Sequence, residues 1–165
     1  MTKKDSIPSY VTHPRYGDRP VISSDEVPAC AIESAHWRYS SLNYFAETAI
    51  FADTSKQNFA IYPRKIYVDI EEMCDVCCRP FIFFAQEQKH WFEELGFWID
   101  AHCTRCIECR KKDQGVRFMH KRYQKLITLK ARTPPQNREL KQIAIELYKL
   151  GYMRDKNKLN IDIES

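Results

Sequence analysis

Residues 74–109 read CDVCCRPFIFFAQEQKHWFEELGFWIDAHCTRCIEC and hold six of the seven cysteines of the 165-residue chain. The N-terminus carries no apolar segment of the kind that directs export, so we expect a cytoplasmic, reducing compartment. Cysteines gathered in this way more often bind metal there than form disulfides. Three C-x2-C pairs lie in the stretch: Cys74–Cys77, Cys103–Cys106 and Cys106–Cys109.

This spacing predicts a tetrahedral metal site. Two thiolates three positions apart on a tight turn can face one ion, with Zn–S distances of about 2.3 Å, and two such turns complete a four-thiolate shell. The first pair is Cys74 and Cys77, the second can be read in either of two registers, and His102 could replace a cysteine. We expect one structural Zn²⁺, although a rubredoxin-like iron also suits four thiolates.

The composition and motifs argue against several classes of protein. Hydrophobic residues make up 44% of the chain, enough for a folded core, and no apolar run approaches the roughly 18 residues that span a membrane. Four thiolates would close the metal shell, whereas catalytic zinc keeps an open position. The chain contains no H-E-x-x-H and no nucleophile-elbow motif. We therefore expect neither an enzyme nor a membrane partner.

The 28 residues that separate Cys77 from Cys106 must be inserted between two metal-binding turns. Residues 79–84 (RPFIFF) are aromatic and β-branched, which predicts a strand. Residues 85–95 place their apolar side chains on one face of a short helix, and Gly96 follows where a helix often ends. Residues 58–70 are also rich in apolar and β-branched side chains and predict a strand that leads into the first turn. The predicted order is therefore strand, turn, strand, helix, return and second turn.

These motifs resemble those of a family of small bacterial proteins named for a probable zinc-ribbon domain. The matching motifs are C-x2-C at 74–77, PFIF at 80–83, A-x-E-Q-x-x-W at 85–91, G-F at 96–97 and R-C-x2-C-R at 105–110. The resemblance covers about residues 70–112 and implies a zinc site with four ligands: Cys74, Cys77, Cys106 and Cys109. The R-C-x2-C-R context favours Cys106 with Cys109 over Cys103 with Cys106. The resemblance implies no established biochemical activity.

The predicted fold class is α+β, a small four-cysteine zinc ribbon with an inserted short helix, an extended N-terminal arm and a C-terminal helical hairpin. Residues 1–57 are expected to form the arm and an irregular segment that packs on the core, because prolines recur there. Residues 58–114 are expected to form the ribbon domain. Residues 115–165 show two helical apolar periods separated by Thr133-Pro134-Pro135, which predicts the hairpin.

Charge is concentrated after the cysteines. Residues 105–132 hold ten Lys and Arg against two Asp and Glu, a net charge of +8 in a chain whose total is +4. A basic segment beside a metal-binding turn is typical of a contact with nucleic acid or an acidic protein, although a solvated helix face gives the same pattern. The candidate contact residues are Arg110, Lys111, Lys112, Arg117, Lys121, Arg122 and Lys125.

The combined interpretation is a zinc-binding interaction module. Its zinc would hold a small domain together, since the free energy of metal binding becomes free energy of folding. Two alternatives remain open. One is a thiol-based redox or zinc-release sensor, in which Cys78 lies next to the first ligand pair and the C-x2-C thiolates react with an oxidant. The other is a zinc ion with a purely structural role.

Overall fold

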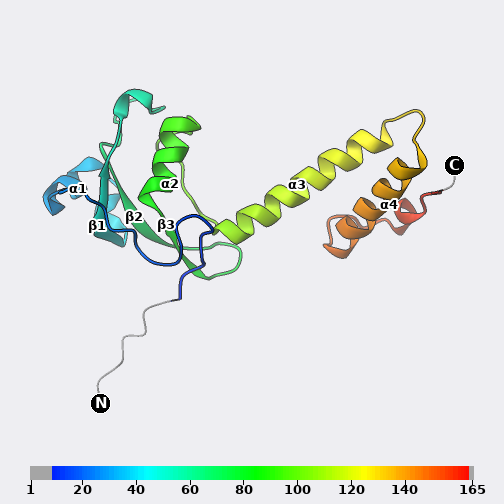
Figure 1. Ribbon diagram of the computed structural model, residues 1–165, viewed down its shortest axis with the longest axis horizontal. Coiled ribbons are helices and arrows are strands. Elements are labelled where there is room, and N and C mark those ends of the chain that lie inside the picture. Colours follow the sequence, from blue (N-terminus) through cyan, green and yellow to red (C-terminus); the bar gives the residue numbers. More distant parts are fainter. Residues whose placement is uncertain (1–8, 164–165) are drawn as a thin grey trace, which may run out of the picture. The chain divides into compact units, whose positions relative to one another are not determined.

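The computed structural model describes residues 9–163, and the chain divides into two compact units. The first unit ends at Cys109, and the second begins at Arg110. The first contains a sheet and the clustered cysteines, and the second is helical (Figure 1). In the described part of the chain, no helix combines the length and apolar character needed to cross a bilayer.

The first unit is built on a three-stranded antiparallel sheet. Its strands are β1 (Tyr44–Phe51), β2 (Ile66–Met73) and β3 (Pro80–Phe83), in the spatial order β1-β2-β3. Alternate residues of the central strand β2 point to opposite faces. Val68 packs against α1 (Ala29–Ala35), whereas Tyr67 packs beneath α2 (Ala85–Lys89), so the sheet lies between the two helices (Figure 1).

Strand β1 lies within the segment for which the sequence predicted irregular structure. Its pairing with β2 shifts register between Phe45 and Ile50, which interrupts the alternation of apolar and polar residues that identifies a strand. At this irregularity, the backbone N–H of Asp69 donates to Thr48 Oγ1 at 2.8 Å, which satisfies a polar group that the ladder would otherwise leave unpaired. The bulge therefore hides the strand from sequence analysis, and the Thr48 hydroxyl supplies an acceptor for β2 at this point.

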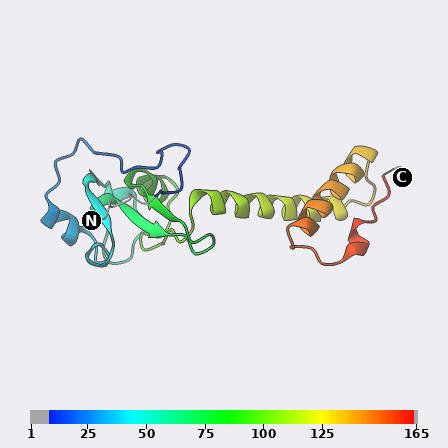
Figure 2. The ribbon, with the colours of Figure 1, turned by 90° about the horizontal axis from the view of Figure 1, so that it is seen from below.

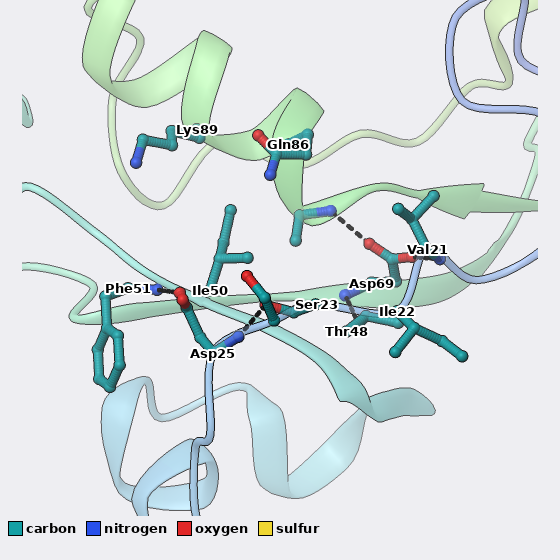
Figure 3. A pocket seen from close by; sticks show the side chains of 12 residues that line it. Val21, Ile22, Ser23, Asp25, Thr48, Ile50, Phe51, Asp69, Gln86 and Lys89 are labelled. Carbon is teal, nitrogen blue, oxygen red and sulfur yellow. Dashed lines mark hydrogen bonds between the residues drawn. The ribbon is translucent and has the colours of Figure 1, made fainter.

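The N-terminal arm is bound along the sheet and the start of α2. The N–H of Val11 donates to the Pro80 carbonyl at 3.0 Å, and the N–H of Val21 donates to Asp69 Oδ2 at 2.8 Å. The other oxygen of Asp69 accepts the N–H of Ala85 at 2.6 Å, at the first residue of α2 (Figure 3). One buried carboxylate therefore joins the arm, the central strand and a helix, and the arm runs past the start of α2 (Figure 2).

The predicted helix after β3 is confirmed. It comprises α2 and a single π-helical turn, His90–Glu94, and Gly96 follows in the left-handed conformation with a φ of 67°. Phe92, which belongs to this turn, is completely buried against Tyr67 of β2. The helix thus closes one face of the sheet before the chain returns toward the second cysteine pair.

The C-terminal helical pair is also confirmed. Helix α3 spans Ile107–Ile127 and α4 spans Pro134–Lys149, followed by a short 3-10 turn at Lys156–Leu159. Buried side chains of the two helices form a core of their own: Tyr123, Leu126, Leu140, Ala144, Leu147 and Met153. The start of α4 is capped, because the N–H of Thr133 donates to Gln136 Oε1 at 2.9 Å.

Candidate metal centre

The first cysteine pair lies in the turn of the β2–β3 hairpin. The N–H of Cys74 donates to the Arg79 carbonyl at 3.1 Å, and the N–H of Cys78 donates to the Cys74 carbonyl at 2.9 Å. Cys78 takes the left-handed conformation with a φ of 55°, which folds the turn tightly after Cys77. This geometry lets the sulfurs of Cys74 and Cys77 face the same point.

The second pair lies at the start of helix α3. Cys106 directly precedes the helix, and Cys109 lies in its first turn. The loop before the helix is tied to the hairpin turn, because the N–H of Asp75 donates to the Thr104 carbonyl at 2.9 Å. An ion pair between Arg79 and Glu108 provides a second link between the two ligand-bearing segments.

The four sulfur atoms form a compact group with the dimensions of a metal shell. The Sγ atoms of Cys74, Cys77, Cys106 and Cys109 all lie within 4.8 Å of one another. The Sγ atoms of Cys77 and Cys106 are 3.8 Å apart. A regular tetrahedron with metal–sulfur bonds of about 2.3 Å has edges of about 3.8 Å. The group is therefore fit to hold one metal ion.

Apolar side chains enclose the site. Cys74, Cys106 and Cys109 are buried in one cluster with Val11 of the arm, which also contains Cys103 and the two phenylalanines of β3. Only Cys77 among the ligands is partly exposed. Water has little access to such a shell, so a bound ion would be held by protein sulfur alone.

The electrostatics of the four thiols also fit a bound cation. Burial acts to raise the pKa of Cys74, but backbone N–H groups of Cys77 and Cys106 aimed at its sulfur lower it to about 6. A hydrogen bond from Arg79 lowers the pKa of Cys77. Burial raises the pKa of Cys106, and burial together with the neighbouring thiols raises that of Cys109 to about 12. A divalent cation would offset this repulsion and hold all four groups as thiolates.

The structure decides between the two registers left open by the spacing. Cys103 is buried nearby, but its sulfur contacts the Arg105 carbonyl at 3.4 Å and is not part of the four-sulfur group. His102 is not part of it either, and Cys78 is exposed. Within residues 9–163, the four-cysteine group is the one cluster of potential ligands that could hold a metal ion.

The predicted basic contact residues lie on α3 but differ in exposure. Lys111, Lys112, Arg117, Lys121 and Lys125 are exposed, whereas Arg110 and Arg122 are partly buried. Arg122 is engaged by Glu139 of α4 through two hydrogen bonds of 2.6 and 2.7 Å. Arg122 is therefore a structural residue of the helical pair, and the exposed lysines and Arg117 carry the available positive charge.

Comparison with known families corrects the predicted fold of the metal-binding segment. Residues 68–117 match the family model described as a probable treble clef domain. A zinc ribbon would hold its second cysteine pair on another β-turn, whereas here that pair lies at the N-terminus of α3. The prediction of a ribbon was therefore wrong, and the same spacing serves a turn followed by a helix. Searches of curated proteins and of solved structures found no match.

Proposed function

We propose that the four cysteines hold one structural Zn²⁺ and that the protein is a nucleic-acid-binding module whose contact surface is the exposed basic side of α3. Four sulfur ligands and the apolar enclosure support a closed site, which lacks the open position of a catalytic zinc. Cys106 and Cys109 lie at a helix N-terminus, where the helix dipole favours negative charge. This arrangement supports a binding function rather than catalysis.

The distribution of charge between the two units carries the proposal. Residues 110–165 contain fifteen Lys and Arg against six Asp and Glu, a net charge of +9, whereas residues 1–109 have a net charge of −5. So strong a separation concentrates positive potential on the small helical unit. Binding of nucleic acid neutralises such charge and releases counterions from the phosphates, which is a favourable, salt-dependent contribution.

The surface of α3 supports nucleic acid over an acidic protein. Arg117, Lys121 and Lys125 recur every four residues and therefore lie along one side of the helix. Phe118 is 70% exposed beside them, and with Lys121 and Lys125 it lines a shallow hollow at the edge of α4. Aromatic faces among basic residues are typical of surfaces that contact both phosphates and bases.

The test is duplex binding by the zinc-loaded chain across a salt series, using a labelled 20-base-pair DNA and its RNA counterpart. The triple variant Arg117→Gln/Lys121→Gln/Lys125→Gln should bind more weakly, and the slope of log K against log salt should fall by about 2.7 if each residue meets one phosphate. Arg154→Gln/Lys156→Gln/Lys158→Gln is the matched control, because it removes the same charge from exposed residues outside α3. Absence of binding at low salt, or equal losses in the two variants, would overturn the proposal.

A further inference from the structure

A pocket on the first unit has a composition that the metal centre and α3 do not explain. It has a volume of about 390 Å³ and lies between the end of α1, residues 60–65 and the segment that returns from α2. The residues that give it chemical character are His36, Trp37, Tyr62, Lys65, Trp98 and Asp100. They come from three separate stretches of sequence that the fold brings together.

Three aromatic rings line this pocket and present free surface to it. Tyr62 is 79% exposed, Trp37 is 71% exposed and Trp98 is 46% exposed. Among residues 9–163, neither Tyr62 nor Trp98 stacks on another ring, and Trp37 meets the His36 ring at 5.6 Å. Large aromatic side chains exposed together around one hollow mark a binding surface, because a folded protein rarely leaves such area in water without use.

The polar groups at the edge of the pocket are only partly satisfied. Asp100 Oδ1 lies 3.2 Å from His36 Nε2, and Arg64 Nη2 lies 3.3 Å from the same nitrogen. That nitrogen can donate to the carboxylate or accept from the guanidinium, but it cannot do both. Asp100 Oδ2 has no partner among the described residues, so it can accept a hydrogen bond from a ligand.

A buried, uncompensated arginine lies behind His36. Arg64 is only 2% exposed, and its guanidinium is held by the Ile99 carbonyl at 2.9 Å, by Gln88 at 3.4 Å and by the Phe92 ring. In the described part of the chain it forms no ion pair with a carboxylate. Buried charges are normally paired, so this guanidinium adds a positive potential that the protein itself does not neutralise.

The charges around the pocket select the class of ligand. Arg64 and Lys65 are positive, Asp100 is negative, and His36 is kept neutral because burial and the adjacent Arg64 lower its pKa to about 4. A methylated ammonium group would suit the aromatic rings, but it would meet this surplus of positive charge. A nucleotide of a single strand offers a flat base for stacking, N–H groups for the carboxylate and a phosphate for Lys65.

We infer that this pocket binds an unpaired base of single-stranded nucleic acid, stacked on the exposed rings of Trp98 and Tyr62 with Asp100 accepting from the base edge. The inference rests on the proposed nucleic-acid function and adds a second contact with different chemistry. Basic residues on α3 would hold phosphates of any sequence, whereas the pocket would favour single-stranded segments.

The experiment uses two probes with the zinc-loaded full chain. A single-stranded tetranucleotide should quench tryptophan fluorescence, because Trp37 and Trp98 line the pocket whereas Trp91 packs between Phe83 and Phe97. A blunt duplex and the same duplex with a four-nucleotide overhang are compared by anisotropy. Stacking of one base is worth about 1–3 kcal/mol, so the overhang should tighten binding about 5- to 150-fold.

Variants separate the pocket from the rest of the surface. Trp98→Leu and Tyr62→Ala should each reduce the gain from the overhang and leave blunt-duplex affinity unchanged, and Trp98→Phe should restore part of it. Phe51→Ala is the matched control, since Phe51 is a 56% exposed aromatic outside the pocket. An unchanged affinity with the overhang, with the blunt duplex still bound, would overturn the pocket alone. If no duplex binds, the proposed function fails, and the tetranucleotide then decides the pocket separately. Quenching in the native chain that is lost in Trp98→Leu would support the pocket. Absence of quenching in the native chain would overturn it.

Discussion

The coordination shell of the metal can be predicted from the sulfur geometry. A separation of 3.8 Å between the Sγ atoms of Cys77 and Cys106 is one edge of a tetrahedron. The centre of a regular tetrahedron lies at about 0.61 of its edge from each vertex, so a shell whose six edges all had this length would hold the metal about 2.3 Å from each sulfur. X-ray absorption at the zinc edge should therefore show four sulfur scatterers at about 2.3 Å and no light-atom scatterer.

Substitution of single cysteines tests the register of the second pair. Cys109→Ser should leave three sulfur scatterers and one oxygen at about 2.0 Å, because serine offers a shorter, harder ligand. The apparent zinc affinity should fall by more than about 100-fold, since even loss of an outer-shell partner costs 10- to 100-fold. Cys103→Ser is the matched control, because Cys103 is buried in the same cluster but lies outside the four-sulfur group. It should retain four sulfurs and one zinc per chain.

Three results would refute this reasoning. Loss of one sulfur in Cys103→Ser together with four sulfurs in Cys109→Ser would establish the other register. A nitrogen scatterer in the native protein would place His102 in the shell. Equal loss of zinc in the two variants would mean that the buried cluster as a whole, rather than four specific sulfurs, determines metal binding.

Three further predictions concern stability and ionisation. Burial raises the pKa of Asp69 from 3.8 to about 6, so its protonated form is favoured in the folded state and its contribution to stability is lost as pH rises through that range. In denaturant titrations between pH 5 and 7, the free energy of unfolding of the native chain should fall by about 1 kcal/mol relative to that of Asp69→Asn. A difference between the two proteins that stays constant with pH would contradict the raised pKa. The pH dependence from His36 has the opposite sign, because burial, and then Arg64, lower its pKa to about 4. Its contribution to stability is therefore present above pH 6.5 and is lost on acidification. NMR at pH 5.5 should show a neutral His36 ring. Leu147→Ala should destabilise the helical pair by about 2–5 kcal/mol in urea unfolding, because Leu147 is completely buried, whereas the half-exposed Leu150→Ala should change it by less than about 0.5 kcal/mol.

The first pair of candidate ligands was predictable because covalent spacing limits what cysteines can do, whereas spacing left the second pair open and the family resemblance favoured Cys106 with Cys109. Cys74 and Cys77 can face one ion in a tight turn wherever that turn lies. The type of fold around the second pair was not predictable from spacing alone, because a β-turn and a helix N-terminus both bring residues i and i+3 together. One signal was available: residues 110–115 contain no proline and a single glycine, Gly115, and one glycine is tolerated inside a helix. The helix could therefore have been extended back to the cysteines.

The aromatic pocket lay beyond sequence analysis for a different reason. Trp37, Tyr62 and Trp98 are separated by 25 and 36 positions, and each alone resembles an ordinary core or surface residue. Their proximity depends on α1 and on the pairing of Asn58 with Trp98, which is an isolated parallel bridge outside the sheet. Contacts of this kind follow from tertiary packing and have no local periodicity to reveal them.

Removal of the metal should separate the two halves of the proposed function. The hairpin turn and its surrounding cluster depend on the four sulfurs, so chelation leaves thiols that repel one another when ionised and an apolar cluster without its centre. The helical unit has its own core around Leu126 and Leu147 and the paired Arg122 and Glu139, none of which involves the metal. Chelated protein should therefore keep most of its helical circular dichroism and its salt-dependent duplex binding, but lose the fluorescence response to single-stranded tetranucleotide if the first unit unfolds. Simultaneous loss of helix signal and duplex binding would show that the helical pair cannot fold without the metal centre.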